Sequence, residues 1–414
     1  MEKRIYPCDE HILPLSKIDR HALFIMEKLA ASGHTAYLVG GSVRDLLLNQ
    51  KPKDFDISTS AKPEEIKRLF RNCILIGRRF RLAHIRFGQK AIEVSTFRSG
   101  DPEADSLILR DNIWGTPEED ALRRDFTING LFYDPATQTI IDYIGGFPDI
   151  QKNYLRTIGQ PHLRFRQDPV RMIRLLKFQA RFGFEIDPDT HVALLENRHE
   201  ILKSSQARIL EELLRMLEMG TSKPFFHLLT QHGFTQLLMP LLGSFLEDEK
   251  GNEVFSYLEE VDAHYHQSGG AKYERPLLLS CILFPMLQHR MRIHYLQREK
   301  LPHLGEIQNE TLSLMRETFS PFFHLSRRMR MQLTFILTAQ YRFTPLEKKK
   351  KYRLRIPRDP TFALALRFFK LRTCLEPGLF QMWEEWNKAF REHTCALTAP
   401  QKKDISSRFR HHAS

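Results

Sequence analysis

Two aspartates and two glycines are the residues whose types and spacing first suggest chemistry in this chain. Asp54 and Asp56 stand two apart in the stretch DFDIS, and in a strand such residues share one face, separated by a rise of about 6.5 Å. Two carboxylates placed so close repel each other unless a cation lies between them. Gly40 and Gly41 come shortly before, and adjacent glycines let the backbone turn sharply and let another group approach its N–H donors. The pattern predicts a site for a cation and an anionic group.

The elements that must position these groups are short. Residues 37–39 are apolar and predict a strand that leads into the two glycines. Residues 42–48 predict a short helix, and a phosphate could rest on the N–H groups at its start. The aspartates then begin a second strand, in which Phe55 and Ile57 would face the core.

A third carboxylate follows in the stretch AIEVSTF. Ile92 and Val94 alternate there with Glu93, so Glu93 stands on the opposite face from the apolar residues. Glu93 could lie beside Asp54 and Asp56, or it could be an ordinary exposed glutamate of a strand. The spacing alone leaves both interpretations open.

Two arginines and an acid stand at the start of the apolar stretch RRDFTINGLF. The planar guanidinium groups of Arg123 and Arg124 can hold triphosphate oxygens through paired hydrogen bonds, which lysine cannot do. Asp125 could orient one of these arginines or assist an attacking hydroxyl. The alternative is a capping acid beside two solvated arginines.

These motifs together resemble those of the DNA polymerase β-type nucleotidyltransferases. The residues VRD shortly after the glycines and the run RRDFTIN resemble the class II branch, which holds bacterial poly(A) polymerases and CCA-adding enzymes. The resemblance covers roughly residues 16–220. It implies an α+β fold: an N-terminal polymerase β-type head, with a mixed sheet and helices, followed by a mainly α-helical neck, body and tail. The implied divisions are a catalytic head at 1–160, a helical neck at 161–220, and an RNA-binding body with a basic tail at 221–414.

The neck would carry a nucleobase-reading motif in RFRQDPVRMIR. Asp168 and the proline after it predict a capped helix start, and Arg171 and Arg174 would lie near one side of that helix. The stretch resembles the class II pattern E-D-x-x-R, with Gln167 in place of the usual acid. The resemblance implies that Asp168 and Arg171 pair with the edge of the base. The alternative is that Asp168 only caps the helix.

Composition and charge favour a polyanionic partner. The net charge is +12, and residues 348–358, KKKKYRLRIPR, form a basic run of the kind that binds phosphate backbones in a salt-dependent way. No apolar run approaches the length of about 20 residues that a membrane span needs, and the N-terminus lacks the apolar core of a signal peptide. A cytoplasmic protein without membrane association is therefore expected. The five cysteines lie far apart, which fits neither a disulfide framework nor a zinc site.

The resemblance implies nucleotidyl transfer with ATP as substrate and two Mg²⁺ ions as cofactors. The expected partners are single-stranded RNA 3′ ends and ATP, with RNA-decay proteins as further candidates. The implied site residues fall into four groups: the catalytic acids Asp54, Asp56 and Asp125; the metal ligands Asp54, Asp56 and Glu93; the nucleotide-binding residues Gly40, Gly41, Arg44, Arg124, Asn129, Asp168, Arg171 and Arg174; and the RNA-binding residues Lys348, Lys349, Lys350, Lys351, Arg353 and Arg355.

Within the family, the sequence favours one activity over two alternatives. The stretches LIGRRFRLAHIRFG and LILRDNIWG resemble bacterial poly(A) polymerase, so template-independent addition of AMP to RNA 3′ ends is the expected reaction. A CCA-adding tRNA nucleotidyltransferase is the runner-up. A catalytically inactive RNA-binding protein that kept the fold is the third interpretation, and the intact D-x-D and RRD motifs argue against it.

Overall fold

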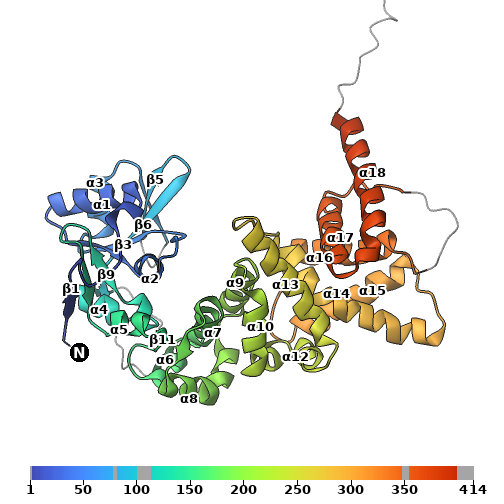
Figure 1. Ribbon diagram of the computed structural model, residues 1–414, viewed down its shortest axis with the longest axis horizontal. Coiled ribbons are helices and arrows are strands. Elements are labelled where there is room, and N and C mark those ends of the chain that lie inside the picture. Colours follow the sequence, from blue (N-terminus) through green and yellow to red (C-terminus); the bar gives the residue numbers. More distant parts are fainter. Residues whose placement is uncertain (1, 78–81, 100–112, 347–353, 399–414) are drawn as a thin grey trace, which may run out of the picture. The chain divides into compact units, whose positions relative to one another are not determined.

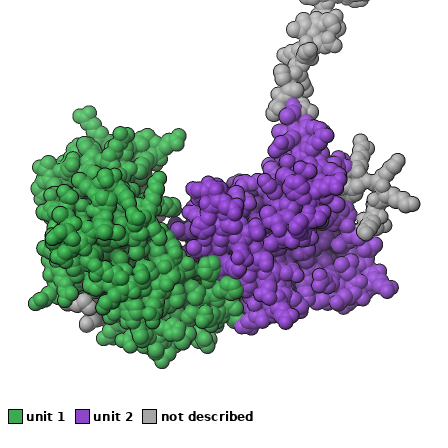
Figure 2. All heavy atoms as spheres, in the orientation of Figure 1, with its two compact units in different colours: residues 1–212, 224–237 green, residues 213–223, 238–414 purple. Residues whose placement is uncertain are grey.

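The computed structural model describes residues 2–77, 82–99, 113–346 and 354–398. The chain divides into two compact units (Figure 2): unit 1 comprises Met1–Glu212 and Pro224–Leu237, and unit 2 comprises Leu213–Lys223 and Leu238–Ser414. No helix in the described ranges is both long enough and apolar enough to cross a membrane.

Unit 1 is built on a mixed sheet of eight strands. The strand order is β1-β10-β9-β2-β3-β6-β5-β4, and all neighbours pair antiparallel except β3 and β6, which run parallel. The strands are β1 (Arg4–Tyr6), β2 (Ala36–Val39), β3 (Asp56–Thr59), β4 (Cys73–Ile76), β5 (Leu82–Phe87), β6 (Lys90–Thr96), β9 (Phe132–Asp134) and β10 (Thr139–Asp142). Two short pairs complete the strands: β7 (Arg98–Ser99) with β8 (Ile113–Trp114), and β11 (Tyr154–Leu155) with β12 (Glu185–Ile186).

Helices of unit 1 pack on the sheet and continue after it. Helix α1 packs against β2 and β3, and α3 packs against β4 and β5. A buried apolar cluster that includes Val39, Phe97 and Phe132 brings β2, β9 and helix α4 together. The helices are α1 (Arg20–Ala31), α2 (Gly41–Leu47), α3 (Pro63–Leu69), α4 (Pro117–Leu122), α5 (Gly146–Gln151), α6 (Pro161–Gln167), α7 (Val170–Phe182), α8 (Pro188–Asn197), α9 (Gln206–Leu217), α10 (Ser222–Gln231) and α11 (Phe234–Leu238), with α9, α10 and α11 crossing the division between the units.

The described part of unit 2 is helical. Helices α13, α14, α16 and α17 pack on one another, and their core includes the stacked rings of Tyr257 and Phe368, whose centroids lie 5.8 Å apart. The helices are α12 (Pro240–Glu247), α13 (Gly251–Gln267), α14 (Arg275–His294), α15 (Leu304–Phe319), α16 (Arg327–Phe343), α17 (Phe362–Leu375) and α18 (Phe380–Thr398), as drawn in Figure 1. The predicted fold class, a mixed-sheet head followed by a mainly helical region, is confirmed.

Candidate active site

Two of the three predicted metal ligands, Asp56 and Glu93, lie on the neighbouring inner strands β3 and β6 of the sheet. The parallel pairing of β3 with β6 puts Asp56 directly opposite Glu93. Asp54 precedes β3, so the prediction that it shares a strand face with Asp56 is wrong. The reason is the register: the partner strand β2 ends at Val39, opposite Asp56, and the chain then turns away at Gly40, whose φ is 66°.

The charges of these carboxylates act on one another. Poor solvation, followed by the negative charges of Glu93 and Asp54, raises the pKa of Asp56 to about 6, against the opposing effect of Arg124. The other two carboxylates have side-chain nitrogen atoms nearby: Lys53 Nζ lies 3.8 Å from Asp54, and His84 Nε2 lies 3.5 Å from Glu93. A cation placed among the three acids would relieve the repulsion.

The donor set suits a hard cation, although the side chains do not converge on one point. Carboxylate oxygens are the ligands that Mg²⁺ prefers, with waters and substrate phosphates completing its shell. Within the described ranges, no group of three or more His, Cys, Asp or Glu side chains is gathered to hold a metal ion. The register that places Asp56 opposite Glu93 favours a cation here, and the raised pKa of Asp56, caused by burial and then by the charges of Glu93 and Asp54, agrees with it.

The glycine turn lies against Arg124. Gly40 has the positive φ that favours glycine, and a Cβ built on it would lie 2.8 Å from Arg124 Nη1. A side chain at Gly40 is thus excluded both by backbone conformation and by the close guanidinium group. Arg124 also donates from Nη2 to Ser58 Oγ at 3.4 Å. The turn and the arginine predicted to hold the triphosphate are therefore neighbours.

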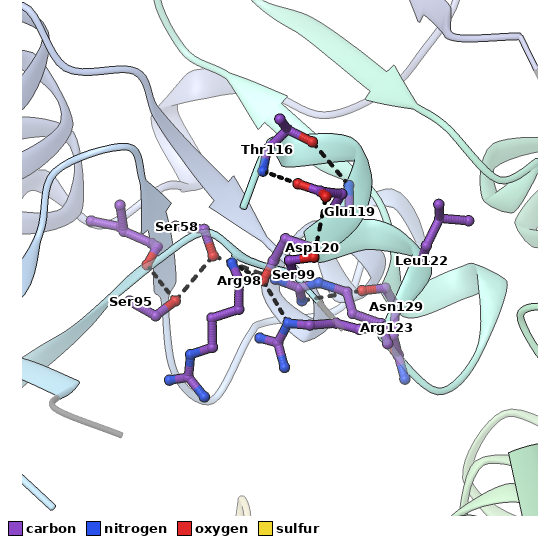
Figure 3. A network of polar contacts seen from close by, with 12 residues as sticks. Ser58, Ser95, Arg98, Ser99, Thr116, Glu119, Asp120, Leu122, Arg123 and Asn129 are labelled. Atoms are coloured by element: carbon purple, nitrogen blue, oxygen red, sulfur yellow. Dashed lines mark hydrogen bonds and ion pairs between the residues drawn. The ribbon is translucent and has the colours of Figure 1, made fainter. Parts of the chain in front are cut away.

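A buried acid that the sequence interpretation missed, Asp120, holds both arginines of the RRD motif. It accepts hydrogen bonds from Arg123 Nε and Arg124 Nη2, each at 2.8 Å, and its side chain is fully buried. Figure 3 shows Asp120 and Arg123 within this network, where the backbone N–H of Arg98 also donates to Asp120. Burial alone would raise the pKa of Asp120, but Arg124 and Arg123 more than offset it and lower the pKa. Asp120 precedes Arg123 by three residues and Arg124 by four, and on a helix this spacing could have indicated the two ion pairs.

Arg44 and Asn129 are engaged inside the protein. Arg44 is 4% exposed, its Nε and Nη2 donate to Asp45, and its Nη1 donates to Asn129. Its guanidinium carbon lies 4.9 and 4.8 Å from the ring centres of Phe178 and Phe182 of α7. All three nitrogens of Arg44 are therefore used, and these hydrogen bonds join it to Asp45 and Asn129, none of them to Asp54, Asp56 or Glu93. Its predicted contact with a triphosphate stays a prediction.

Asp125 is buried, and its carboxylate is bound by other side chains. Its carboxylate pairs with Arg174 at 2.7 Å and accepts from Asn129 Nδ2 at 3.0 Å. Burial opposes its charge, but Arg174 and the hydrogen bonds lower its pKa below the ordinary value. Asp125 thus anchors Arg174, and a direct catalytic role for it stays a prediction.

The structure corrects the helix-capping interpretation of Asp168. Helix α7 begins at Val170, and no side chain caps it. The carboxylate of Asp168 instead pairs with Arg208 of α9 at 2.8 Å, and this arginine is half exposed. Arg171 is 6% exposed and donates to the backbone carbonyls of Arg164 and Arg123, both at 3.3 Å. Base reading by Asp168 and Arg171 is untested by this arrangement and stays a prediction.

Arg164 is a second residue that the sequence interpretation missed. Its side chain is 1% exposed, and it donates to the carbonyls of Leu122 and Arg124 at 3.3 and 2.5 Å and to Gln167 Oε1 at 3.1 Å. Burial and the charge of Arg171 lower its pKa to about 9, against Asp125 and Asp168. Arg164 and Arg171 thus satisfy the last carbonyls of α4 and the residues after it, and so help fix the position of Arg124.

Replacing Arg164 with lysine should weaken folding, because one ammonium group cannot reach all three acceptors. Each buried acceptor left unpaired costs about 1–3 kcal/mol, so the Arg164→Lys variant should lose about 2–4 kcal/mol of unfolding free energy. Chemical denaturation of the purified protein measures this loss. The matched control is Arg166→Lys, because Arg166 is on the same helix, is exposed, and makes one bond, to Asn197. Equal losses in both variants would contradict the special role of Arg164.

Most of the predicted RNA-binding run lies outside the described residues. Lys348, Lys349, Lys350, Lys351 and Arg353 belong to that part of the chain. Arg355 is described and exposed.

Parts of the sequence that form this site match known protein families. Residues 36–156 match the family described as the poly A polymerase head domain, and residues 183–246 match that described as a probable RNA and SrmB-binding site of polymerase A. Poly(A) polymerase I of Escherichia coli strain CFT073 is 41% identical over 268 residues, which are 62% of this chain and 58% of that protein. The chain is therefore similar to poly(A) polymerases and CCA-adding enzymes over these residues. The resemblance predicted from the sequence motifs is confirmed.

Other relatives in the family are CCA-adding enzymes. That of Bacillus velezensis is 34% identical over 229 residues, 54% of this chain and 56% of its own length. The chain therefore spans less than two thirds of either curated relative. Among solved structures, the CCA-adding enzyme of Bacillus stearothermophilus in complex with CTP has a TM-score of 0.61 at 25% identity, covering 90% of this chain and 82% of that one. A tRNA nucleotidyltransferase complexed with a primer tRNA and an ATP analogue has a TM-score of 0.58 at 21% identity and shares the fold.

Proposed function

We propose that this protein is a template-independent polynucleotide adenylyltransferase, which adds AMP from ATP to RNA 3′ ends. The observation that carries the proposal is the pairing of Asp56 with Glu93 on the same sheet as the Gly40 turn, which lies against Arg124. Acids that repel one another beside a glycine turn and a guanidinium group suit a metal-bound triphosphate. The 41% identity to a poly(A) polymerase favours ATP and RNA as substrates.

In the proposed reaction the RNA 3′-hydroxyl attacks the α-phosphorus of ATP, and pyrophosphate leaves. Asp54, Asp56 and Glu93 would hold two Mg²⁺ ions, which when bound neutralise charge and lower the pKa of the hydroxyl. The N–H groups of Gly41 and its neighbours and the guanidinium of Arg124 would hold the triphosphate. In this proposal the donors and charges that would bind the phosphates are already in position before ATP binds.

The neck would choose the base. Asp168 and Arg171 would pair with the edge of adenine, so that protein side chains replace a template. This requires Asp168 to exchange its partner Arg208 for the base. Asp125, Asn129 and Arg174 would hold the neck residues in place, because Asp125 binds both of the others.

The remaining expectations belong to the same proposal. We infer a head at 1–160, a neck at 161–220 and an RNA-binding body at 221–414, with Lys348–Lys351, Arg353 and Arg355 contacting RNA phosphates. The protein would act in the cytoplasm, and RNA-decay proteins are candidate partners.

A labelled-RNA assay with each NTP supplied separately tests the proposed function. With an unstructured RNA and ATP alone, the purified protein should add many adenosines of heterogeneous length and should use CTP poorly. A poly(A) polymerase needs one base preference and lets the RNA end slide after each addition. If the purified protein incorporates no nucleotide, the proposal is wrong.

A CCA-adding tRNA nucleotidyltransferase is the second candidate. It is favoured by the solved structures that share this fold, among them a CCA-adding enzyme in complex with CTP. Such an enzyme must use CTP and then ATP, and must stop at a fixed length. Addition of C, C and A to a truncated tRNA, followed by a halt, would decide for this candidate.

A further inference from the structure

A groove of about 1100 Å³ lies along α16 in unit 2, whereas the residues proposed to bind ATP and metal ions belong to unit 1. Of the residues proposed to contact RNA, Arg355 lines the groove. Its base is one stripe of the helix: Arg327, Met331, Phe335, Thr338 and Arg342 recur at intervals of three or four residues. This spacing places them on one side of the helix. Helix α15 and the segment 355–362 also line the groove. Figure 1 shows α15 and α16 in this unit.

The floor of the groove is apolar and open to solvent. Met331 is 63% exposed and Leu312 of α15 is 38% exposed, although both line the same hollow. Exposed large apolar side chains gathered in a groove mark interaction sites more often than chance contacts. Methionine suits such a surface because its flexible side chain adapts to a partner.

The rim of the groove is cationic. Arg327, Arg328 and Arg330 stand in the first turn of α16, and Arg342 and Arg355 also line the groove, against the single acid Asp359. Among the described residues, no carboxylate pairs with Arg327, Arg328 or Arg330. Arg327, Arg328 and Arg330 are therefore available to an acidic partner, which would meet complementary charge around an apolar centre.

We propose that this groove docks an acidic amphipathic helix of a partner protein. Two helices and an apolar floor form the kind of trough into which a third helix packs its apolar stripe. Helix α16 extends over 17 residues, about 25 Å at 1.5 Å per residue, which matches four to five turns of a partner helix. Glutamates and aspartates flanking its apolar stripe would face the arginine rim.

Charge and burial argue against other occupants. The C-terminal residues QKKDISSRFRHHAS and a second copy of this chain, with net charge +12, are both basic, so the rim would repel them. Single-stranded RNA is usually held by aromatic faces on which bases stack. In this groove the rings of Phe343, Phe362 and Trp386 are only 1–3% exposed, so they form the floor and offer no stacking platform.

Fluorescence anisotropy of the full chain with a synthetic peptide tests the proposal. The peptide has about 18 residues, long enough to match α16, with leucines at i, i+3, i+4 and i+7 and glutamates elsewhere. Saturable binding is expected. Met331→Glu should weaken it about tenfold or more, because the new carboxylate meets the acidic peptide inside the groove, and Arg327→Glu should act in the same direction.

Two matched variants outside the groove separate this effect from general charge. Met382→Glu changes another exposed methionine, on α18, and Arg298→Glu changes another exposed arginine; both should bind the peptide as the parent does. A labelled single-stranded RNA should bind the Met331→Glu and Met382→Glu variants equally. No peptide binding, or equal weakening in groove and control variants, would overturn the proposal. Loss of RNA affinity in Met331→Glu alone would overturn it in favour of an RNA site.

Discussion

Asp56→Asn should abolish nucleotide transfer while leaving the protein folded, and Asp54→Asn should do the same. Bound metal ions contribute several kcal/mol of charge stabilisation in such reactions. Because each ~1.4 kcal/mol changes a rate tenfold, loss of a ligand should lower kcat/KM by on the order of 10³-fold. Initial rates of AMP incorporation at saturating Mg²⁺ measure this effect.

The folded state should tolerate the loss of the Asp56 charge. The pKa of Asp56 is raised to about 6 by poor solvation and by Glu93 and Asp54, so its ionised form is disfavoured in the folded protein. A raised carboxyl pKa means that stability declines as pH rises from the unfolded value through about 6. The asparagine variant avoids this loss, so at neutral pH its Tm should equal or exceed that of the parent.

The matched control is Glu27→Gln, which removes an exposed carboxylate from α1 of the same unit. It should keep normal transfer. Near-normal turnover of both aspartate variants would place the metal site elsewhere, whereas a fall in Tm together with the loss of activity would show that the acids support the fold.

The local part of the site followed from the sequence because it depends on neighbouring residues. The glycine turn, α2 and the apolar pattern of β2 are properties of one short stretch, and the structure has them where the pattern predicted. The position of Glu93 depends on the parallel pairing of β3 with β6, across a separation of 37 residues. The alternation of apolar and polar residues along β6 predicts which face of the strand carries Glu93. It does not predict that Asp56 lies opposite, so the sequence left two interpretations open.

The contacts of Arg44 and Asp168 inside the protein could not be predicted from the spacing of residues in the sequence. Arg44 follows the glycines as a triphosphate-binding residue would, yet the rings of Phe178 and Phe182 cover it, and these rings arrive from a helix about 130 residues later in the chain. Asp168 precedes a proline as a capping residue would, but Arg208 of α9 takes its carboxylate. In each case the side chain has a partner distant in the sequence that the local motif could not reveal, and at Asp168 this partner replaces the predicted cap.

Arg124→Ala should produce the second large loss of activity. Arg124 lies against the Gly40 turn, where we propose that its guanidinium group donates to triphosphate oxygens. Charge-assisted hydrogen bonds contribute about 1.5–3 kcal/mol each, so losing one or two of them should raise the KM for ATP or lower kcat/KM by on the order of 10²-fold. Arg124→Lys should recover only part of the loss, because an ammonium group lacks the planar fork.

The decisive comparison is with Arg123→Ala, because Arg123 and Arg124 both bind the buried Asp120 at 2.8 Å. The pKa of Asp120 is lowered by both arginines despite burial, so its charge stabilises the fold above its unfolded pKa and that stability is lost as pH falls. Either alanine variant should therefore unfold at a higher pH in acid titrations. If only Arg124→Ala also loses ATP use, Arg124 acts on the nucleotide directly. Equal losses of kcat/KM in the two variants would mean that Asp120 supports the site through the fold, and that Arg124 does not hold the triphosphate.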